Sequence, residues 1–248
     1  MQLLDFGGIA LPDRMAAYEI PASAAVSRVA VAGGRVGSYV LGTKHETRKY
    51  TASGLFLRNQ IYQYDVDRNI DQLRRMIGVT STLRQKMRDG SIRCCEAILI
   101  SCKAENNNQS TASMAQPITF EFESDQFWRE ETQQIRILTN ALEASCANAG
   151  NAECINIKIE VSSQITKPLI ISNARNGYAL TYDAAKAVGQ TLIIDGFAST
   201  VTVNGANAYG NMTIPDSQIE LMKLESGWNK LQFNQPVTGA IKYNHTWL

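Results

Sequence analysis

Hydrophobic and polar residues alternate over much of the chain, with the period of two that a half-buried strand requires. Two clear examples are residues 118–123 and 155–161. Asn176-Gly177 and Asn204-Gly205 supply turn signals typical of two-residue hairpins. This pattern predicts a mostly β protein.

The spacing of apolar residues changes to three and four between Asp65 and Asp89, which indicates one face of a helix. The apolar residues of this stretch are Val66, Ile70, Leu73, Met76, Ile77, Leu83 and Met87. Asp65 or Asp67 is suited to cap the start, and Asp89-Gly90 is suited to end it. We therefore predict one long helix over residues 65–89. Its basic residues are interpreted as a solvated face, with nucleic-acid contact as the alternative.

Short strands separated by turn signals fill the chain after Cys154, as is typical of a β-sandwich. The small and polar stretch 144–153 fits either a domain linker or a hairpin tip. We predict an N-terminal β-barrel or sandwich-like domain over residues 1–133, which holds the helix, and a C-terminal β-sandwich over residues 134–248. Segments 42–51 and 103–114 are predicted to be polar loops.

The bulk composition excludes several classes of protein. The chain has 248 residues and a formal net charge of +1, so it has no global attraction to nucleic acid or to an anionic membrane. No apolar run approaches the ~20 residues that a membrane helix needs, and we expect no secretory signal. The five cysteines are expected to be reduced, with a Cys146–Cys154 bridge as the exception to consider.

The chain lacks an arrangement of residues that indicates catalysis. The two histidines, His45 and His245, have no partner at metal-ligand spacing, and no nucleophile elbow or phosphate-binding glycine loop is present. Glu121 and Glu123 are interpreted as the polar face of a strand, although a carboxylate pair also serves glycoside hydrolases. We expect no enzymatic activity, no metal and no other cofactor.

Two stretches resemble a known family. Residues 118–128, Ile-Thr-Phe-Glu-Phe-Glu-Ser-Asp-Gln-Phe-Trp, are similar to the strand that closes the N-terminal domain of siphophage distal tail proteins. Gln126 stands where family members often have proline. Residues 224–233, Leu-Glu-Ser-Gly-Trp-Asn-Lys-Leu-Gln-Phe, are similar to the stretch before the last strands of the galectin-like C-terminal domain in that family. The order of strands, helix, strands and sandwich follows the family layout over nearly the whole chain.

The resemblance implies a galectin-like fold for the C-terminal sandwich and a structural role in the tail tip of a bacteriophage. Members of this family form a homo-hexameric ring that joins the tail tube to the tip and host-adsorption apparatus. The implied partners are the tail tube protein, the tail-associated tip protein and, in some members, a receptor-binding protein. The implied location is the virion, after assembly in the cytoplasm of the bacterial host.

A ring of identical contacts needs loops or strand edges that a neighbouring subunit completes. We therefore expect the loop 103–114 at a subunit or ring interface. The candidate interface residues are Asn106, Asn107, Asn108, Lys44, His45 and Trp247.

Two other functions remain as alternatives. One is another phage tail or baseplate protein. The other is a carbohydrate-binding β-sandwich protein, in which Trp228 and Tyr209 stack on sugar rings. Trp228 follows Ser226-Gly227 at the start of a predicted strand, and we interpret it instead as a rim aromatic that packs on the core.

Overall fold

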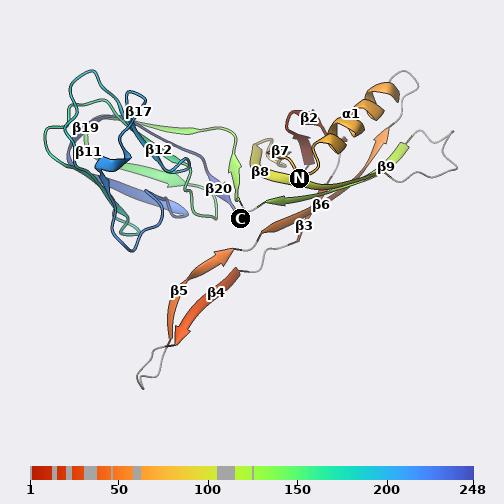
Figure 1. The fold of residues 1–248 in the computed structure, drawn as a ribbon, viewed down its shortest axis with the longest axis horizontal. Helices are drawn as coiled ribbons and strands as arrows, with labels where there is room; N and C mark the ends of the chain where they lie inside the picture. The colour runs from red at the N-terminus through yellow and green to blue at the C-terminus, as the bar shows by residue number, and fades with distance from the viewer. Residues whose placement is uncertain are drawn as a thin grey trace. The chain divides into compact units, whose positions relative to one another are not determined.

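The computed structural model describes residues 2–12, 16–20, 24–30, 38–45, 47–57, 63–104, 115–124 and 126–248. The chain divides into two compact units, Met1–Phe127 and Trp128–Leu248. Strands dominate both units (Figure 1), so the prediction of a mostly β protein is confirmed. No helix within the described residues is long and apolar enough to cross a membrane.

The first unit holds an antiparallel sheet with the strand order β2-β1-β7-β8-β9-β6-β3, and a hairpin of β4 with β5. Its elements are β1 (Gln2–Phe6), β2 (Ile9–Ala10), β3 (Ala16–Ile20), β4 (Ala24–Ala30), β5 (Ser38–His45), β6 (Arg48–Leu57), α1 (Gln63–Arg75), β7 (Thr80–Lys86), β8 (Ile92–Ala104) and β9 (Ala115–Ser124).

The prediction of one long helix over residues 65–89 is wrong. Helix α1 ends at Arg75, and Gly78 then adopts a φ of +82°, which a side-chain-bearing residue rarely adopts. The following run from Val79 to Thr82 is rich in β-branched residues, which favour a pleated strand over a helix. Residues Thr80–Lys86 therefore form β7, which pairs with β8.

The residues predicted to end the helix instead form the turn between β7 and β8. Asp89 Oδ1 accepts hydrogen bonds from the Ser91 backbone N–H at 2.9 Å and from Ser91 Oγ at 2.7 Å. Gly90 has a φ of +88°. An aspartate followed by a glycine thus supplies a hairpin turn as readily as a helix end, and the flanking pattern decides between them.

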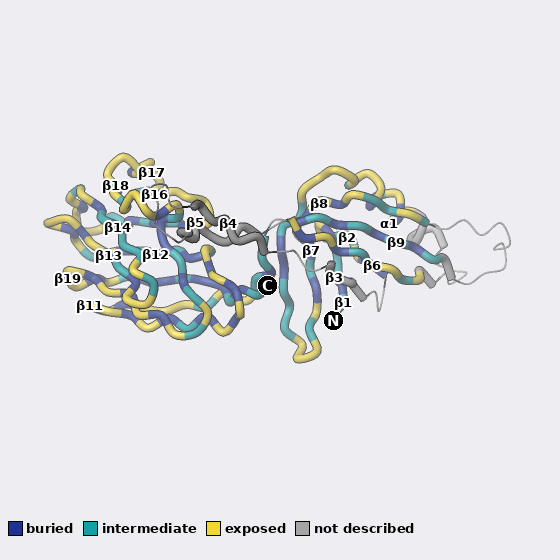
Figure 2. Tube along the Cα trace, turned by 90° about the horizontal axis from the view of Figure 1, so that it is seen from below, coloured by how far each residue is buried: buried dark blue, intermediate teal, exposed yellow. Residues whose placement is uncertain are grey.

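The core of the first unit follows the predicted alternation of residues 118–123. Phe120 and Phe122 are buried, and the ring centroids of Phe6 and Phe122 lie 5.3 Å apart. Figure 2 shows the resulting change between buried and more exposed positions along the strands.

The segment 42–51, predicted as a polar loop, lies largely within β5 and β6. Polar residues do not rule out a strand, because some of them can occupy its outward positions. Lys49, for example, lies 3.2 Å from Glu123 on β9, whereas its neighbour Tyr50 is buried. Of the other predicted loop, Lys103 and Ala104 end β8, and residues 105–114 lie outside the described residues.

The second unit holds a sheet with the order β17-β16-β15-β12-β19-β13-β14-β18, and β11 pairs with the other edge of β19. Its elements are β10 (Trp128–Glu130), β11 (Gln134–Asn148), β12 (Ile157–Val161), β13 (Leu169–Asn173), β14 (Ala179–Tyr182), β15 (Leu192–Asp195), β16 (Thr200–Val203), β17 (Ala206–Asn207), the 3-10 helix η2 (Tyr209–Asn211), β18 (Met212–Thr213), β19 (Gly227–Tyr243) and β20 (Thr246–Trp247).

The long strand β19 lets this sheet curl around one core. Its first half, at residues 231–233, pairs with β13, and its second half, at residues 239–243, pairs with β12 on the same edge. Gly239 lies at the start of the second half, and β11 carries bulges opposite, where Asn140 has a φ of +49°. The two halves therefore contribute side chains such as Leu231 and Ile159 to a single buried cluster.

Strand β11 includes residues 144–148, part of the stretch that the sequence analysis interpreted as either a domain linker or a hairpin tip. Ala144 and Cys146 are buried, and Ser145 between them is exposed. All five cysteines are free thiols, so Cys146 and Cys154 do not form a bridge. Burial raises the pKa of the Cys146 thiol to about 11, which keeps it protonated at neutral pH.

Substitution of Gly239 tests the close approach of β19 to β12. A Cβ at this position would overlap the backbone carbonyl of Glu160 on β12, which cannot move without breaking the strand pairing. We expect Gly239→Ala to lower the free energy of unfolding by about 3 kcal/mol. The matched control is Gly210→Ala, because a Cβ at Gly210 meets no atom within 4 Å. Urea denaturation of both variants measures the difference, and equal midpoints would contradict the explanation.

Low pH should lower the folding stability of the second unit by protonating Asp195. Burial alone would raise its pKa, but the Lys158 ammonium at 2.8 Å and the N–H groups of Ala198 and Phe197 hold the pKa below 3.8. The stabilisation is therefore complete above pH 3.8 and is lost as the pH falls through the folded-state pKa. We expect Asp195→Asn to cost about 1 kcal/mol at pH 7. That difference in unfolding free energy should shrink toward zero in acid, and a constant difference would refute the assignment.

Candidate interaction surfaces

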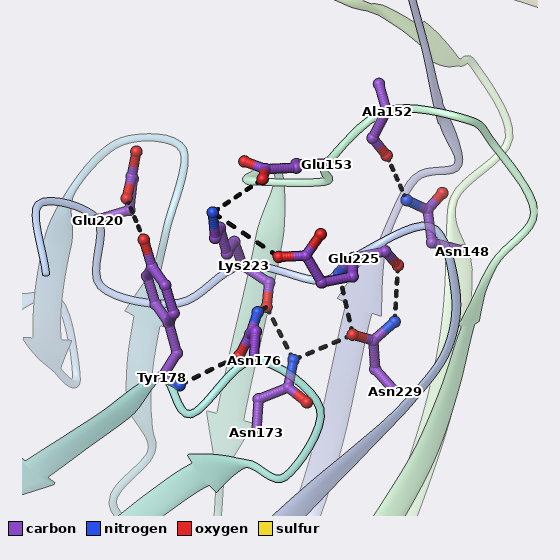
Figure 3. A network of polar contacts seen from close by, with 10 residues as sticks. All are labelled: Asn148, Ala152, Glu153, Asn173, Asn176, Tyr178, Glu220, Lys223, Glu225 and Asn229. Carbon is purple, nitrogen blue, oxygen red and sulfur yellow. Dashed lines mark hydrogen bonds and ion pairs between the residues drawn. The ribbon is translucent and has the colours of Figure 1, made fainter. Parts of the chain in front are cut away.

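A network of buried amide side chains organises the turn that leads into β19 (Figure 3). Asn229 Oδ1 accepts the backbone N–H of Glu225 at 2.9 Å, and its Nδ2 donates to the Glu225 carbonyl at 2.8 Å and to the Gly227 carbonyl at 3.0 Å. Asn173 on β13 donates to Asn229 Oδ1 at 3.0 Å. The turn is therefore held at several points by groups that are themselves shielded from water.

Lys223 ties the preceding loop to the rest of this network. Its ammonium lies 2.9 Å from Glu153, 3.7 Å from Glu225 and 5.0 Å from the centre of the Tyr178 ring. Burial alone would lower the pKa of Lys223, but the hydrogen bond and charge of Glu153, with smaller contributions from Tyr178 and Glu225, raise it on balance. Tyr178 in turn donates its hydroxyl to Glu220 at 2.8 Å. The arrangement therefore fastens the loop to the neighbouring elements.

Sequence reasoning missed Asn173, Lys223 and Asn229. The one available signal was Asn229 itself, a polar residue at an inward position of the alternating stretch that continues with Leu231 and Phe233. A polar residue at such a position must find partners inside the protein. The sequence does not reveal those partners, because Asn173 is distant along the chain and the contacts to Glu225 and Gly227 require the turn to fold back on Asn229.

The tryptophan that follows this turn points away from the core. Trp228 is 71% exposed, so its interpretation as a rim aromatic packed on the core is wrong. Arg175 donates from Nη1 to the Trp228 carbonyl at 2.8 Å, which fixes the backbone but leaves the indole outside. Tyr209, named with Trp228 in the carbohydrate alternative, lies in η2 rather than on β19.

The outward face of the first unit's sheet carries paired charges. Glu121 accepts hydrogen bonds from Ser101 at 2.8 Å and from Lys103 at 3.3 Å, and these contacts lower its pKa. Glu123 pairs with Lys49. Both glutamates therefore lie on the polar face of a strand, as predicted, with cations that neutralise them.

Four exposed aliphatic side chains gather where β7 begins beside β8. We call this set the aliphatic patch: Ile77, Val79, Ile98 and Ile100, each 36–45% exposed. Ile77 bridges to Leu99, and Thr80 is paired with Ile98, so the two chain segments run side by side. Neighbouring aliphatic groups exposed together indicate a contact surface more strongly than single ones do.

The candidate interface residues that the structure describes lie in different elements. Lys44 and His45 end β5, where only the backbone is described. Asn106, Asn107 and Asn108 lie outside the described residues. Trp247 lies in β20, paired with Trp128 of β10. Their role at an interface stays a prediction.

The remaining histidine has a structural contact. His245 Nδ1 accepts the backbone N–H of Ala149 at 3.0 Å, and its ring lies 6.1 Å from those of Tyr243 and Trp247. Within the part of the chain that the structure describes, no group of three or more His, Cys, Asp or Glu side chains is placed to hold a metal ion.

Comparisons with known proteins point to one kind of protein. Residues 149–247 match the family of the siphovirus-type tail component, C-terminal domain. The crystal structure of the Dit protein of phage SPP1, described as a paradigm of the hub adsorption apparatus in phages that infect Gram-positive bacteria, aligns with a TM-score of 0.68. The alignment has 13% identity and covers 100% of this chain and 99% of the SPP1 chain, so it establishes a shared fold.

Other matches are weaker. A chain of the phage p2 baseplate in its activated conformation aligns with a TM-score of 0.42 and 9% identity, over 98% of this chain and 89% of the other. No curated protein sequence matches the chain. Residues 149–247 are therefore similar to the C-terminal domain of siphovirus-type tail components, and the resemblance to siphophage distal tail proteins drawn from the sequence is confirmed.

Proposed function

We propose that this chain forms a homo-hexameric ring in the tail tip of a bacteriophage, where it joins the tail tube to the host-adsorption apparatus. The observation that supports this proposal best is the fold, which follows that of a phage hub protein over the full length of both chains. The family match of residues 149–247 to a tail component supports it independently.

The two parts of the chain have different tasks in this proposal. Residues 1–133 form the ring, and residues 134–248 form a galectin-like β-sandwich. The curled sheet of the second unit, closed around one core, is compatible with such a sandwich. The protein acts in the virion after assembly in the cytoplasm of the bacterial host. It contacts the tail tube protein, the tail-associated tip protein and, through the second unit, a receptor-binding protein.

A structural role rather than an enzymatic one agrees with the surfaces described above. The glutamates on the sheet face are paired with lysines, and the buried polar network fastens loops. The aliphatic patch supplies what a ring needs, which is apolar surface that a neighbouring copy covers. The candidate interface residues Lys44, His45, Asn106, Asn107, Asn108 and Trp247 stay part of the proposal.

The mass of the purified protein under native conditions tests the ring. We expect a species of six or twelve copies of the 27.3 kDa chain by native mass spectrometry. A monomer at all concentrations would contradict the proposal. Long polymers would favour a tail-tube protein with an appended sandwich, the alternative within phage tails.

A charge introduced into the aliphatic patch should break the ring without unfolding the chain. Ile98→Lys and Ile100→Lys each place an ammonium in a contact that excludes water, so we expect assembly to weaken at least about tenfold. Val188→Lys, at a 76% exposed position of the second unit, is the matched control. Size-exclusion chromatography with light scattering gives the mass, and circular dichroism checks the fold. Intact rings in both patch variants would exclude this surface as the ring contact.

A further inference from the structure

The outward face of the β11–β19 pair combines an exposed aromatic residue with polar residues at its Trp228 end. Inward positions of β19 hold Asn229, Leu231 and Phe233, which are buried, and outward positions hold Trp228, Lys230 and Gln232, which are exposed. The register sets these opposite Ala147, Ser145 and Glu143 of β11, respectively. We call these six outward residues the β19 face.

The indole of Trp228 is the only aromatic group on the β19 face and is left uncovered. Its cross-strand neighbour is Ala147, whose methyl group is too small to shield an indole ring. An indole left 71% exposed forgoes much of the stabilisation that burial of its large apolar surface would give. A large aromatic side chain in this situation is a candidate for contact with a ligand.

The indole is also held on a stiff support. Asn229 makes three hydrogen bonds to the backbone of the turn at Glu225 and Gly227, and Asn173 fixes Asn229 from a neighbouring strand. Arg175 holds the Trp228 carbonyl, and Gly227, with a φ of +90°, leaves room for that guanidinium. Because the support is already ordered, a ligand would lose little of its binding energy to ordering the site.

Apart from Trp228 and Ala147, the side chains of the β19 face are hydrogen-bonding groups whose charges sum to zero. Lys230 and Glu143 form an ion pair at 2.6 Å, so their charges cancel, and Gln232 and Ser145 add a neutral amide and a hydroxyl. This balance gives no attraction for a polyanion such as nucleic acid. It suits a ligand that has both an apolar face and many hydroxyl groups.

We propose that the β19 face binds a neutral saccharide, with the apolar face of one sugar ring stacked on Trp228 and the hydroxyls of the next ring bonded to Lys230, Glu143, Ser145 and Gln232. The distance along β19 from Trp228 to Gln232 is about 13 Å, long enough for more than one sugar ring. This site lies within the second unit and does not depend on ring assembly.

Binding of simple sugars to the full-length protein tests this site. The probes are short oligosaccharides of glucose, galactose, N-acetylglucosamine and rhamnose, followed by saturation-transfer NMR and by tryptophan fluorescence. We expect at least one of the four series to bind with a dissociation constant of about 1 mM or lower. Sulfated heparin oligosaccharides should bind no better than the neutral series. No binding by any of the four series would overturn the proposal, and so would preferred binding of heparin.

Variants distinguish sugar binding at the β19 face from nonspecific binding elsewhere on the protein. Trp228→Ala should weaken binding at least about tenfold, Trp228→Phe should keep part of it, and Gln232→Ala should weaken it several-fold. Ile219→Ala, at a 91% exposed position of the same unit, is the control and should bind like the original protein. Because Trp228 is exposed, its variants should keep the urea midpoint. Unchanged affinity in Trp228→Ala with an intact fold would refute the site.

Discussion

The pairing of β11 with β19 is the interaction on which the second unit depends. The two strands share a ladder that runs from Gln134–Tyr243 to Asn148–Gly227. The other edge of β19 pairs with β13 in one half and with β12 in the other, so one strand is common to both halves of the curled sheet. Gly239 lies where the second half begins, opposite the bulges of β11, and approaches β12 closely. A side chain cannot fit at Gly239, because the Glu160 carbonyl occupies that space.

The end of this ladder shows how burial and exposure are divided between adjacent residues. Asn229 is buried, and leaving its amide unpaired would destabilise the fold by about 1–3 kcal/mol. Its amide therefore hydrogen-bonds to the backbone of its own turn. Trp228, one position earlier, must point the opposite way because successive strand residues face opposite sides of the sheet. The order that Asn229 imposes on the turn thus also fixes a large aromatic group on the outer surface.

In both units, the features that we relate to function lie on the surface. In the first unit, the outward sheet face is neutralised by pairs such as Lys49–Glu123, and the aliphatic patch is exposed beside α1 and β7. In the second unit, the β19 face joins an indole to amide, hydroxyl and paired charged groups. Surfaces of these kinds are what the proposed role in a phage tail tip requires.

The sequence by itself determined the mostly β character, the inward Phe120 and Phe122 and the polar role of Glu121 and Glu123, because strict alternation is a local property. It did not determine the secondary structure of residues 76–89. Their apolar spacing fits a helix face, whereas Gly78 and the β-branched residues that follow it favour a strand. The sequence did not identify β11, because the small and polar residues of its second half form a strand only beside β19. The contact of Asn229 with Asn173 and the exposure of Trp228 also depend on the packed sheet, because β13 and β11 are distant from β19 in sequence. Local periodicity indicates which residues can be buried. Which of them are buried depends on how the strands pack in the folded sheet.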